Sequence, residues 1–264
     1  MVNCKRPQNS RTEGNIVAMS LDDMFAPERL VDLTQPFGHE TTLWPGSRPY
    51  RATTTATIAA DGYFARDLDI PEHAGTHLDA PSHFVDGGAH VADIPIDRLV
   101  RPVVVVDVAD HVGDDASFTM GADLLRAAEM RDGPIPAGGA VLIRTGWDRH
   151  IGDPARYLGS PGPACPGIGV DAAKLLVERG VVGIGIDTLG IDPGHLIDCP
   201  AHHITLGAGM WHLEGLVGIE RIPARGAWVI VGVMALAGGS GAPARVVAIV
   251  PPPVDGHQGG PAQA

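Results

Sequence analysis

Four residues of types that bind metals or transfer protons lie close together in the first third of the chain. His73, His77, Asp79 and His83 fall within eleven positions, all at odd numbers. Because side chains of an extended chain repeat with a period of two, His73, His77 and Asp79 are expected to point to one face. A helix would turn Asp79 away from the two histidines, and the prolines and glycine around the cluster also disfavour a helix.

This spacing predicts a divalent metal site with a proton-transfer group beside it. Two imidazoles and a carboxylate can hold Zn²⁺ or Mn²⁺ and leave positions open for water and substrate. Pro81 ends the regular strand, so His83 need not be a ligand. A histidine whose pKa lies near neutrality suits proton transfer. The alternative, ordinary core or surface histidines, explains one such residue better than it explains three beside an aspartate.

A second group of ligand-type residues lies late in the chain. It comprises His195, Asp198, His202, His203, His212 and Glu214. Its crowding suggests a contribution to the same site, but the spacing alone does not separate ligands from bystanders. Cys199 near His202 raises the alternative of a thiol nucleophile, which the metal set disfavours because it explains the histidines. The chain has no Gly-x-Ser-x-Gly motif, which counts against a serine hydrolase.

Composition narrows the class of protein. The 264 residues are 44% hydrophobic and 19% charged, which is typical of a globular domain. The net charge of −12 disfavours nucleic acids and anionic membranes as partners. The expected partner is a small-molecule substrate, although acidity alone says nothing about its identity. Three cysteines without a CxxC pair, and no signal-peptide pattern, favour a cytoplasmic location. The apolar run 227–237 is shorter than the roughly 20 residues of a membrane span.

The rest of the pattern predicts an α/β domain with a mixed sheet. Runs rich in valine and isoleucine predict strands at Val103–Val108, Ala140–Arg144, Val181–Ile186, Trp228–Val233 and Arg245–Val250. Helices are expected at Thr119–Met130, with Thr119 as N-cap, and at Val170–Arg179, with Gly180 just past the end. We expect a flexible N-terminal arm at 1–20, the domain at 21–250, and a Pro/Gly-rich tail at 251–264.

One segment resembles the signature of a known family. The run from His73 to Phe84, His-Ala-Gly-Thr-His-Leu-Asp-Ala-Pro-Ser-His-Phe, matches His-x-Gly-Thr-His-x-Asp-x-Pro-x-His-Phe of the cyclase family of metal-dependent hydrolases. That family includes bacterial kynurenine formamidase and isatin hydrolase. The resemblance runs from about Leu30 to Val250 through Trp44-Pro45-Gly46, Arg144-Thr145-Gly146-Trp147, Gly185-Ile186-Asp187-Thr188, Pro200-Ala201-His202 and Leu213-Glu214-Gly215-Leu216.

The resemblance implies a role for each member of the site. Its metal ligands correspond to His73, His77, Asp79, His202 and Glu214, with one or two Zn²⁺ or Mn²⁺ ions and Asp79 as a bridge when there are two. His83 matches the catalytic histidine. His203 and His212 have no family role and are expected to support the site or lie on the surface. The implied fold is a swivelling β/β/α cyclase-like single domain with a mixed, mostly β core, assembled as a homodimer or homotetramer.

The expected activity is metal-dependent hydrolysis of an amide in a small aromatic substrate. Candidates are an N-formyl arylamine such as formylkynurenine, or a cyclic amide such as isatin. Added residues at 150–166 and at both ends favour isatin hydrolase-like or lactone-cleaving relatives. Trp44, Tyr63 and Phe64 flank the signature and are candidates to line a flat pocket, with ordinary packing as the alternative. Other readings are a lactone hydrolase, a polyketide-type cyclase and a metal-binding protein without turnover.

Overall fold

The computed structural model describes residues 20–159 and 162–252. The flexible arm expected at 1–20 and the tail expected at 251–264 therefore lie almost entirely outside the described residues. Among the residues that are described, no helix is long and apolar enough to cross a membrane.

Eight strands form one mixed sheet that closes on itself. They are β1 (Leu30–Asp32), β4 (His77–Asp79), β5 (Val100–Asp107), β7 (Ala140–Arg144), β9 (Gly183–Ile186), β10 (Trp211–Glu214), β11 (Ala227–Val233) and β12 (Gly241–Ile249). Their order is β1-β12-β11-β5-β7-β9-β10-β4, and β4 also pairs with β12. Seven strands thus enclose a barrel, to which β1 adds along β12. All five strands expected from the sequence are confirmed.

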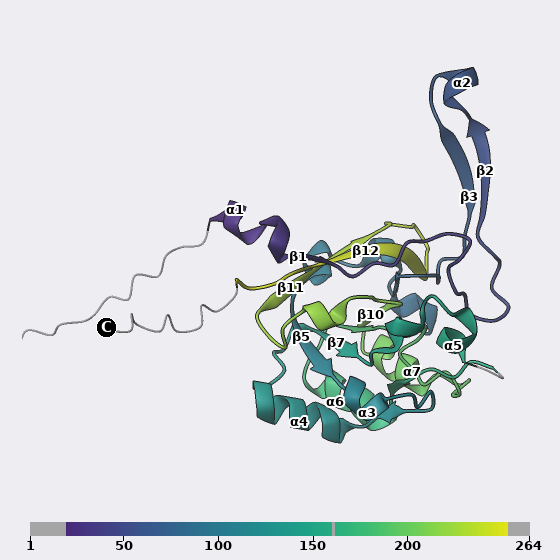
Figure 1. The fold of residues 1–264 in the computed structure, drawn as a ribbon. Helices are drawn as coiled ribbons and strands as arrows, with labels where there is room; N and C mark the ends of the chain where they lie inside the picture. The colour runs from purple at the N-terminus through teal and green to yellow at the C-terminus, as the bar shows by residue number, and fades with distance from the viewer. Residues whose placement is uncertain (1–19, 160–161, 253–264) are drawn as a thin grey trace, which may run out of the picture.

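Alternate residues of the central strands face two apolar cores. In β7, Ala140 and Leu142 point into the barrel, toward residues of β4, β11 and β12. Val141 and Ile143 point outward, toward helices α4 (Ala122–Asp132) and α6 (Val170–Glu178). Both helices cover the same face of the sheet (Figure 1). The runs of consecutive apolar residues arise because these strands are buried on both sides.

The two main helices form where they are expected, except at one start. Thr119 is not an N-cap, because it belongs to a short strand that pairs with residues 167–168. Helix α4 begins at Ala122, whose backbone N–H donates to the Asp171 carboxylate. Asp171, which is distant in sequence, thus provides the hydrogen-bond acceptor for the helix start, where no side chain at the N-cap position does so. Gly180 follows α6 with φ +68°, as its position past the helix end predicts.

The remaining elements are short. They are α1 (Leu21–Met24), β2 (Arg51–Ala56), α2 (Ile58–Asp61), β3 (Ala65–Asp69), α3 (Ala109–Val112), β6 (Thr119–Met120), α5 (Pro154–Leu158), β8 (Gly167–Ile168), α7 (Pro200–Gly207) and 3-10 helices at Pro27–Arg29, Pro81–His83, Val91–Asp93, Ile96–Leu99, Trp147–His150 and Ile219–Arg221. Strands β2 and β3 pair only with each other and project from the barrel as an arm with α2 at its tip (Figure 1).

Candidate metal centre

Strands β4 and β10 lie side by side and carry matching triplets. One reads His77-Leu-Asp79 and the other His212-Leu-Glu214. Their antiparallel register sets His212 opposite Asp79 and Glu214 opposite His77. Because alternate residues of a strand share a face, these four side chains project together while the two central leucines enter the core. The strand pair therefore builds two imidazoles and two carboxylates into one buried cluster.

His73 joins this cluster from a turn and not from the strand. The expectation of one extended segment is wrong for this residue, because β4 begins only at His77. Gly75 has φ +61°, and a Cβ there would lie 2.8 Å from the Phe37 ring. The turn at this glycine breaks the period of two, yet it brings His73 Nδ1 to 2.6 Å from Asp79 Oδ1.

The late histidine arrives from helix α7. His202 places Nε2 3.1 Å from Glu214 Oε1 and 3.6 Å from Asp79 Oδ2. Its Nδ1 lies 2.6 Å from Asp192, which also accepts hydrogen bonds from the backbone N–H groups of Ala201 and His202. Asp192 therefore fixes both the start of α7 and the direction of the ring. Nothing in its local sequence singled it out; its role depends on the distant return of the chain.

The charges of this cluster are strongly coupled. Burial opposes protonation of His77, but the Asp79 and Glu214 carboxylates raise its pKa to about 9. Burial opposes ionisation of Asp79, but the surrounding histidines hold its pKa well below the usual range. His202 likewise has a raised pKa, since its bonds to Asp192 and Asp79 outweigh burial. The carboxylates thus draw positive charge into the interior.

The cluster fits a divalent metal ion. Asp79 is 0% exposed, and its Oδ2 has no hydrogen-bond partner among the described residues. Oxygens and imidazole nitrogens from Asp79, His202, His212 and Glu214 lie within 4.8 Å of one another. A carboxylate oxygen left unpaired in the interior is costly unless a cation meets it. The mixed nitrogen and oxygen donors suit Zn²⁺ or Mn²⁺.

His83 stacks on His73 at the edge of this cluster. Their ring centroids are 3.7 Å apart and their planes differ by 20°. Partial burial is the largest influence on His83 and lowers its pKa to about 4. The sequence-based expectation of a pKa near neutrality is therefore wrong. The ring is therefore neutral at pH 7 and has a lone pair free, but it is a weaker base than an ordinary histidine.

A cavity of about 430 Å³ opens onto the cluster. Its wall includes His73, His77, His83, His202, Glu214, Trp44, Phe84, Leu189, Leu196 and Ile197. Trp44 thus lies where the sequence placed it. Tyr63 and Phe64 do not: they follow α2 at the tip of the arm and are 61% and 59% exposed. Closeness in sequence misled here because the intervening strands carry both rings away from the barrel.

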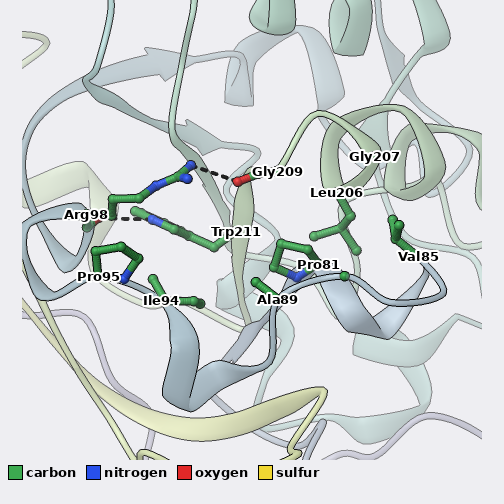
Figure 2. Close-up of a pocket in the computed structure, with 11 residues that line it drawn as sticks. Pro81, Val85, Ala89, Ile94, Pro95, Arg98, Leu206, Gly207, Gly209 and Trp211 are labelled. Atoms are coloured by element: carbon green, nitrogen blue, oxygen red, sulfur yellow. Dashed lines mark hydrogen bonds between the residues drawn. The ribbon is translucent and has the colours of Figure 1, made fainter.

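A smaller cavity of about 220 Å³ is lined by Pro81, Leu206, Trp211 and their neighbours (Figure 2). Its wall is mostly apolar and includes Pro81 and Leu206, from the elements that carry His83 and His202. The Trp211 indole donates to the Arg98 carbonyl, and the Arg98 guanidinium donates to the Gly209 carbonyl. Because this cavity has no histidine or carboxylate in its wall, the larger one is the candidate active site.

The other ligand-type residues late in the chain lie outside the cluster. His195, Asp198 and His203 are exposed, and they belong to none of the ligand clusters that the described residues form. Cys199 lines the larger cavity, but its sulfur bonds to the Leu196 carbonyl, and burial raises its pKa. His202 bonds to Asp192 instead of activating this thiol. The thiol-nucleophile alternative therefore lacks the thiolate that it requires.

Comparison with known proteins identifies the family of this chain. The model of the family described as "Putative cyclase" matches residues 31–193. The chain belongs to the cyclase family. Isatin hydrolase of Roseibium aggregatum is 35% identical over 192 residues, covering 69% of this chain and 73% of that protein. Kynurenine formamidase of Salinibacter ruber is 30% identical over 220 residues, covering 83% and 96%.

Solved structures of cyclase-family proteins share the fold. Isatin hydrolase A from Ralstonia solanacearum superposes with a TM-score of 0.78 at 32% identity, covering 84% of this chain and 92% of that one. An isatin hydrolase bound to the product analogue thioisatinate gives 0.79 at 31%, with the same coverage. The cyclase-like fold expected from the signature is therefore confirmed, with a mixed barrel-like sheet at its core.

The cluster's pKa values predict how pH affects the metal-free protein. His77 holds its proton more tightly when folded (pKa about 9) than when unfolded (6.5), so its stabilising contribution is full below pH 6.5 and is lost as pH rises through 9. His202 acts in the same direction. Urea unfolding of chelator-treated protein should give a lower midpoint at pH 9 than at pH 6.5. His77→Gln should lose less over this range; an unchanged loss would contradict the assignment.

Proposed function

We propose that this chain is a metal-dependent hydrolase that cleaves the carbon–nitrogen bond of an amide in a small aromatic substrate, with cyclic amides such as isatin as the favoured class. The observation that carries the proposal is the buried carboxylate pair Asp79 and Glu214, surrounded by imidazole nitrogens. Glu214 lies at the wall of a cavity that also holds a neutral His83. The similarity to isatin hydrolases and kynurenine formamidases supports the reaction class.

The resident cofactor in this proposal is one or two Zn²⁺ or Mn²⁺ ions, held by His73, His77, Asp79, His202 and Glu214. A divalent ion in such a site supplies a hydroxide nucleophile at neutral pH and polarises a carbonyl oxygen. Metal-binding histidines are normally oriented by a hydrogen bond from their other ring nitrogen. His73, His77 and His202 each have such a partner.

Acceptors outside the cluster orient the imidazoles. His77 Nδ1 lies 3.0 Å from the Gly75 carbonyl, which leaves Nε2 toward Asp79 and Glu214. Ser240 donates its hydroxyl hydrogen to Glu72, so it accepts from His73 Nε2 and leaves Nδ1 toward Asp79. Asp192 does the same for His202. In every case the other ring nitrogen faces the carboxylates, where a metal ion would replace its proton.

His83 is the proposed proton carrier. It shares the cavity wall with the cluster and is neutral at pH 7, so it accepts the proton released when water adds to the amide carbonyl. It then returns that proton to the departing nitrogen as the carbon–nitrogen bond breaks. One water is consumed and a carboxylic acid and an amine result. Trp44 and Leu196 offer apolar surfaces against which a flat ring can lie.

A substrate panel tests this function. Isatin, an N-formyl anilide and an aromatic lactone are each incubated with protein that has been stripped by chelator and resupplied with Zn²⁺ or Mn²⁺. We expect turnover of isatin above the formanilide, abolished by the chelator and restored by metal. Turnover of the lactone alone would favour a lactone hydrolase. No turnover of any compound, in protein that binds metal, would favour a polyketide-type cyclase or a non-catalytic metal-binding role.

Replacing His83 should separate chemistry from metal binding. His83→Ala is expected to lower kcat by about 100-fold or more, the usual range for a lost acid–base group, while metal content stays unchanged. His195→Ala is the matched control, since that histidine is exposed and outside the cluster. Full activity of His83→Ala at normal metal content would rule out the proposed role.

The exposed arm supports assembly into a homodimer or homotetramer. Strands β2 and β3 form an isolated two-stranded sheet, which is marginally stable without a partner. Ile58, Tyr63, Phe64 and Leu68 are all more than half exposed on it. Apolar patches mark interaction sites, and most soluble oligomers are homo-oligomers, so a second copy of the chain is the partner we assign to this surface.

Sedimentation velocity tests this assembly. The wild-type protein is expected to sediment as a dimer or tetramer. The double variant Ile58→Glu, Phe64→Glu should shift to a smaller species with an unchanged circular dichroism spectrum, because both residues are exposed in the single chain. A monomeric wild type, or a variant of the same mass as the wild type, would contradict the role given to the arm.

A further inference from the structure

His212 is the most deeply placed imidazole of the cluster. It is 0% exposed, in the middle of β10 and directly opposite Asp79 on β4. A buried imidazole normally has both ring nitrogens satisfied by hydrogen bonds or by a metal. Only one of its nitrogens is satisfied by another side chain: Nε2 lies 2.7 Å from Thr205 Oγ1.

The hydrogen bonds of Thr205 assign the tautomer of His212. The Thr205 hydroxyl donates its single hydrogen to the Ala201 carbonyl, 2.7 Å away. Its oxygen is therefore an acceptor toward His212, so Nε2 carries the hydrogen and Nδ1 carries a lone pair.

The bare Nδ1 faces another unpaired acceptor. Its neighbour is Asp79 Oδ2 at 3.7 Å, and neither atom has a hydrogen-bond partner among the residues that the structure describes. Two lone pairs pointed at each other in the interior repel unless a cation lies between them. Thr205 thus holds His212 in the one orientation that makes it a ligand.

The spacing of the surrounding donors matches a single ion. His202 Nε2 lies 3.6 Å from Asp79 Oδ2 and 3.1 Å from Glu214 Oε1, beside the 3.7 Å separation at His212. Two ligands of one tetrahedral ion, each at about 2.1 Å, are about 3.4 Å apart. The observed separations bracket that value. All four donor atoms lie within 4.8 Å of one another, close enough to share one ion.

We propose that His212 is a metal ligand through Nδ1, completing a four-ligand site on the Oδ2 side of Asp79 with His202 and Glu214. This inference rests on the proposed metal dependence and adds a residue that the family signature does not supply. His73 and His77 face the other oxygen, Oδ1, and line the cavity, whereas Asp79 and His212 do not. An ion held there would meet Asp79 and His212 away from the cavity, and His202 and Glu214 at its wall.

Metal binding by matched variants tests this ligand. The comparison uses four proteins: wild type, His212→Gln, Thr205→Val and His203→Gln. Each is freed of metal with a chelator and titrated with Zn²⁺ against a competing chelator. The number of bound ions per chain is then measured by mass spectrometry. The Gln side chain places its amide where Nε2 of His212 lies, so Thr205 keeps a hydrogen-bond partner. It has no atom that could bind a metal in place of Nδ1. We expect His212→Gln to lose one ion per chain or to bind it at least 100-fold more weakly.

The controls separate ligation from support of the fold. Thr205→Val keeps Nδ1 of His212 and removes the bond that orients the ring, together with the hydroxyl's bond to the Ala201 carbonyl. Its loss of affinity should therefore be the smaller one, within the roughly 10- to 100-fold range of outer partners. His203→Gln, exposed on the same helix, should bind metal as the wild type does. Unchanged metal number and affinity in His212→Gln would overturn the proposal.

A measurement on the unmodified protein covers the case in which His212→Gln does not fold. In ¹⁵N-histidine NMR spectra of the zinc-loaded wild type, two rings should bind through Nδ1, His73 and His212, and two through Nε2, His77 and His202. A single Nδ1-bound ring would overturn the assignment of His212. A wild type that binds no divalent ion at all would instead refute the proposed metal-dependent function, which keeps the two failures distinguishable.

Discussion

The burial of the Asp79 carboxylate is the constraint on which the rest of the site depends. Asp79 is fully enclosed, and Glu214 beside it is nearly so. An unpaired carboxylate in a protein interior costs several kcal/mol, so the surroundings must supply positive charge or metal. Imidazole nitrogens lie on both sides of the carboxylate, where they can carry positive charge or bind a metal. Its composition follows from electrostatics before any substrate is considered.

The orientation of those imidazoles depends on the closure of the barrel. Ser240, which turns His73, immediately precedes β12, and β12 reaches His77–Asp79 only through the closing β4–β12 pair. Asp192 orients His202 from the loop after β9 and fixes the start of α7 at the same time. The fold therefore positions the site through hydrogen bonds one step removed from the carboxylates. Replacing any of these acceptors should change the affinity of the site for metal.

The sequence predicted the parts of this site that depend on local pattern. Runs of β-branched residues located the central strands, and the spacing of His77 and Asp79 placed both on one face of β4. His212 was named among the late ligand-type residues but was given no ligand role, although its triplet with Glu214 repeats that of His77 and Asp79. The repeat acquires meaning only once β4 and β10 are known to pair. Asp192, the turn at Gly75 and the course of the arm likewise depend on contacts distant in sequence.

Direct location of bound metal tests the central claim that this cluster is a metal site. Crystals of protein purified without added metal, then soaked in Zn²⁺, would be measured above and below the zinc absorption edge. The account predicts an anomalous peak beside Asp79, within about 2.0–2.3 Å of its carboxylate and of the facing imidazole nitrogens. Density free of anomalous signal there, with the histidines hydrogen-bonded directly to Asp79 and Glu214, would contradict it.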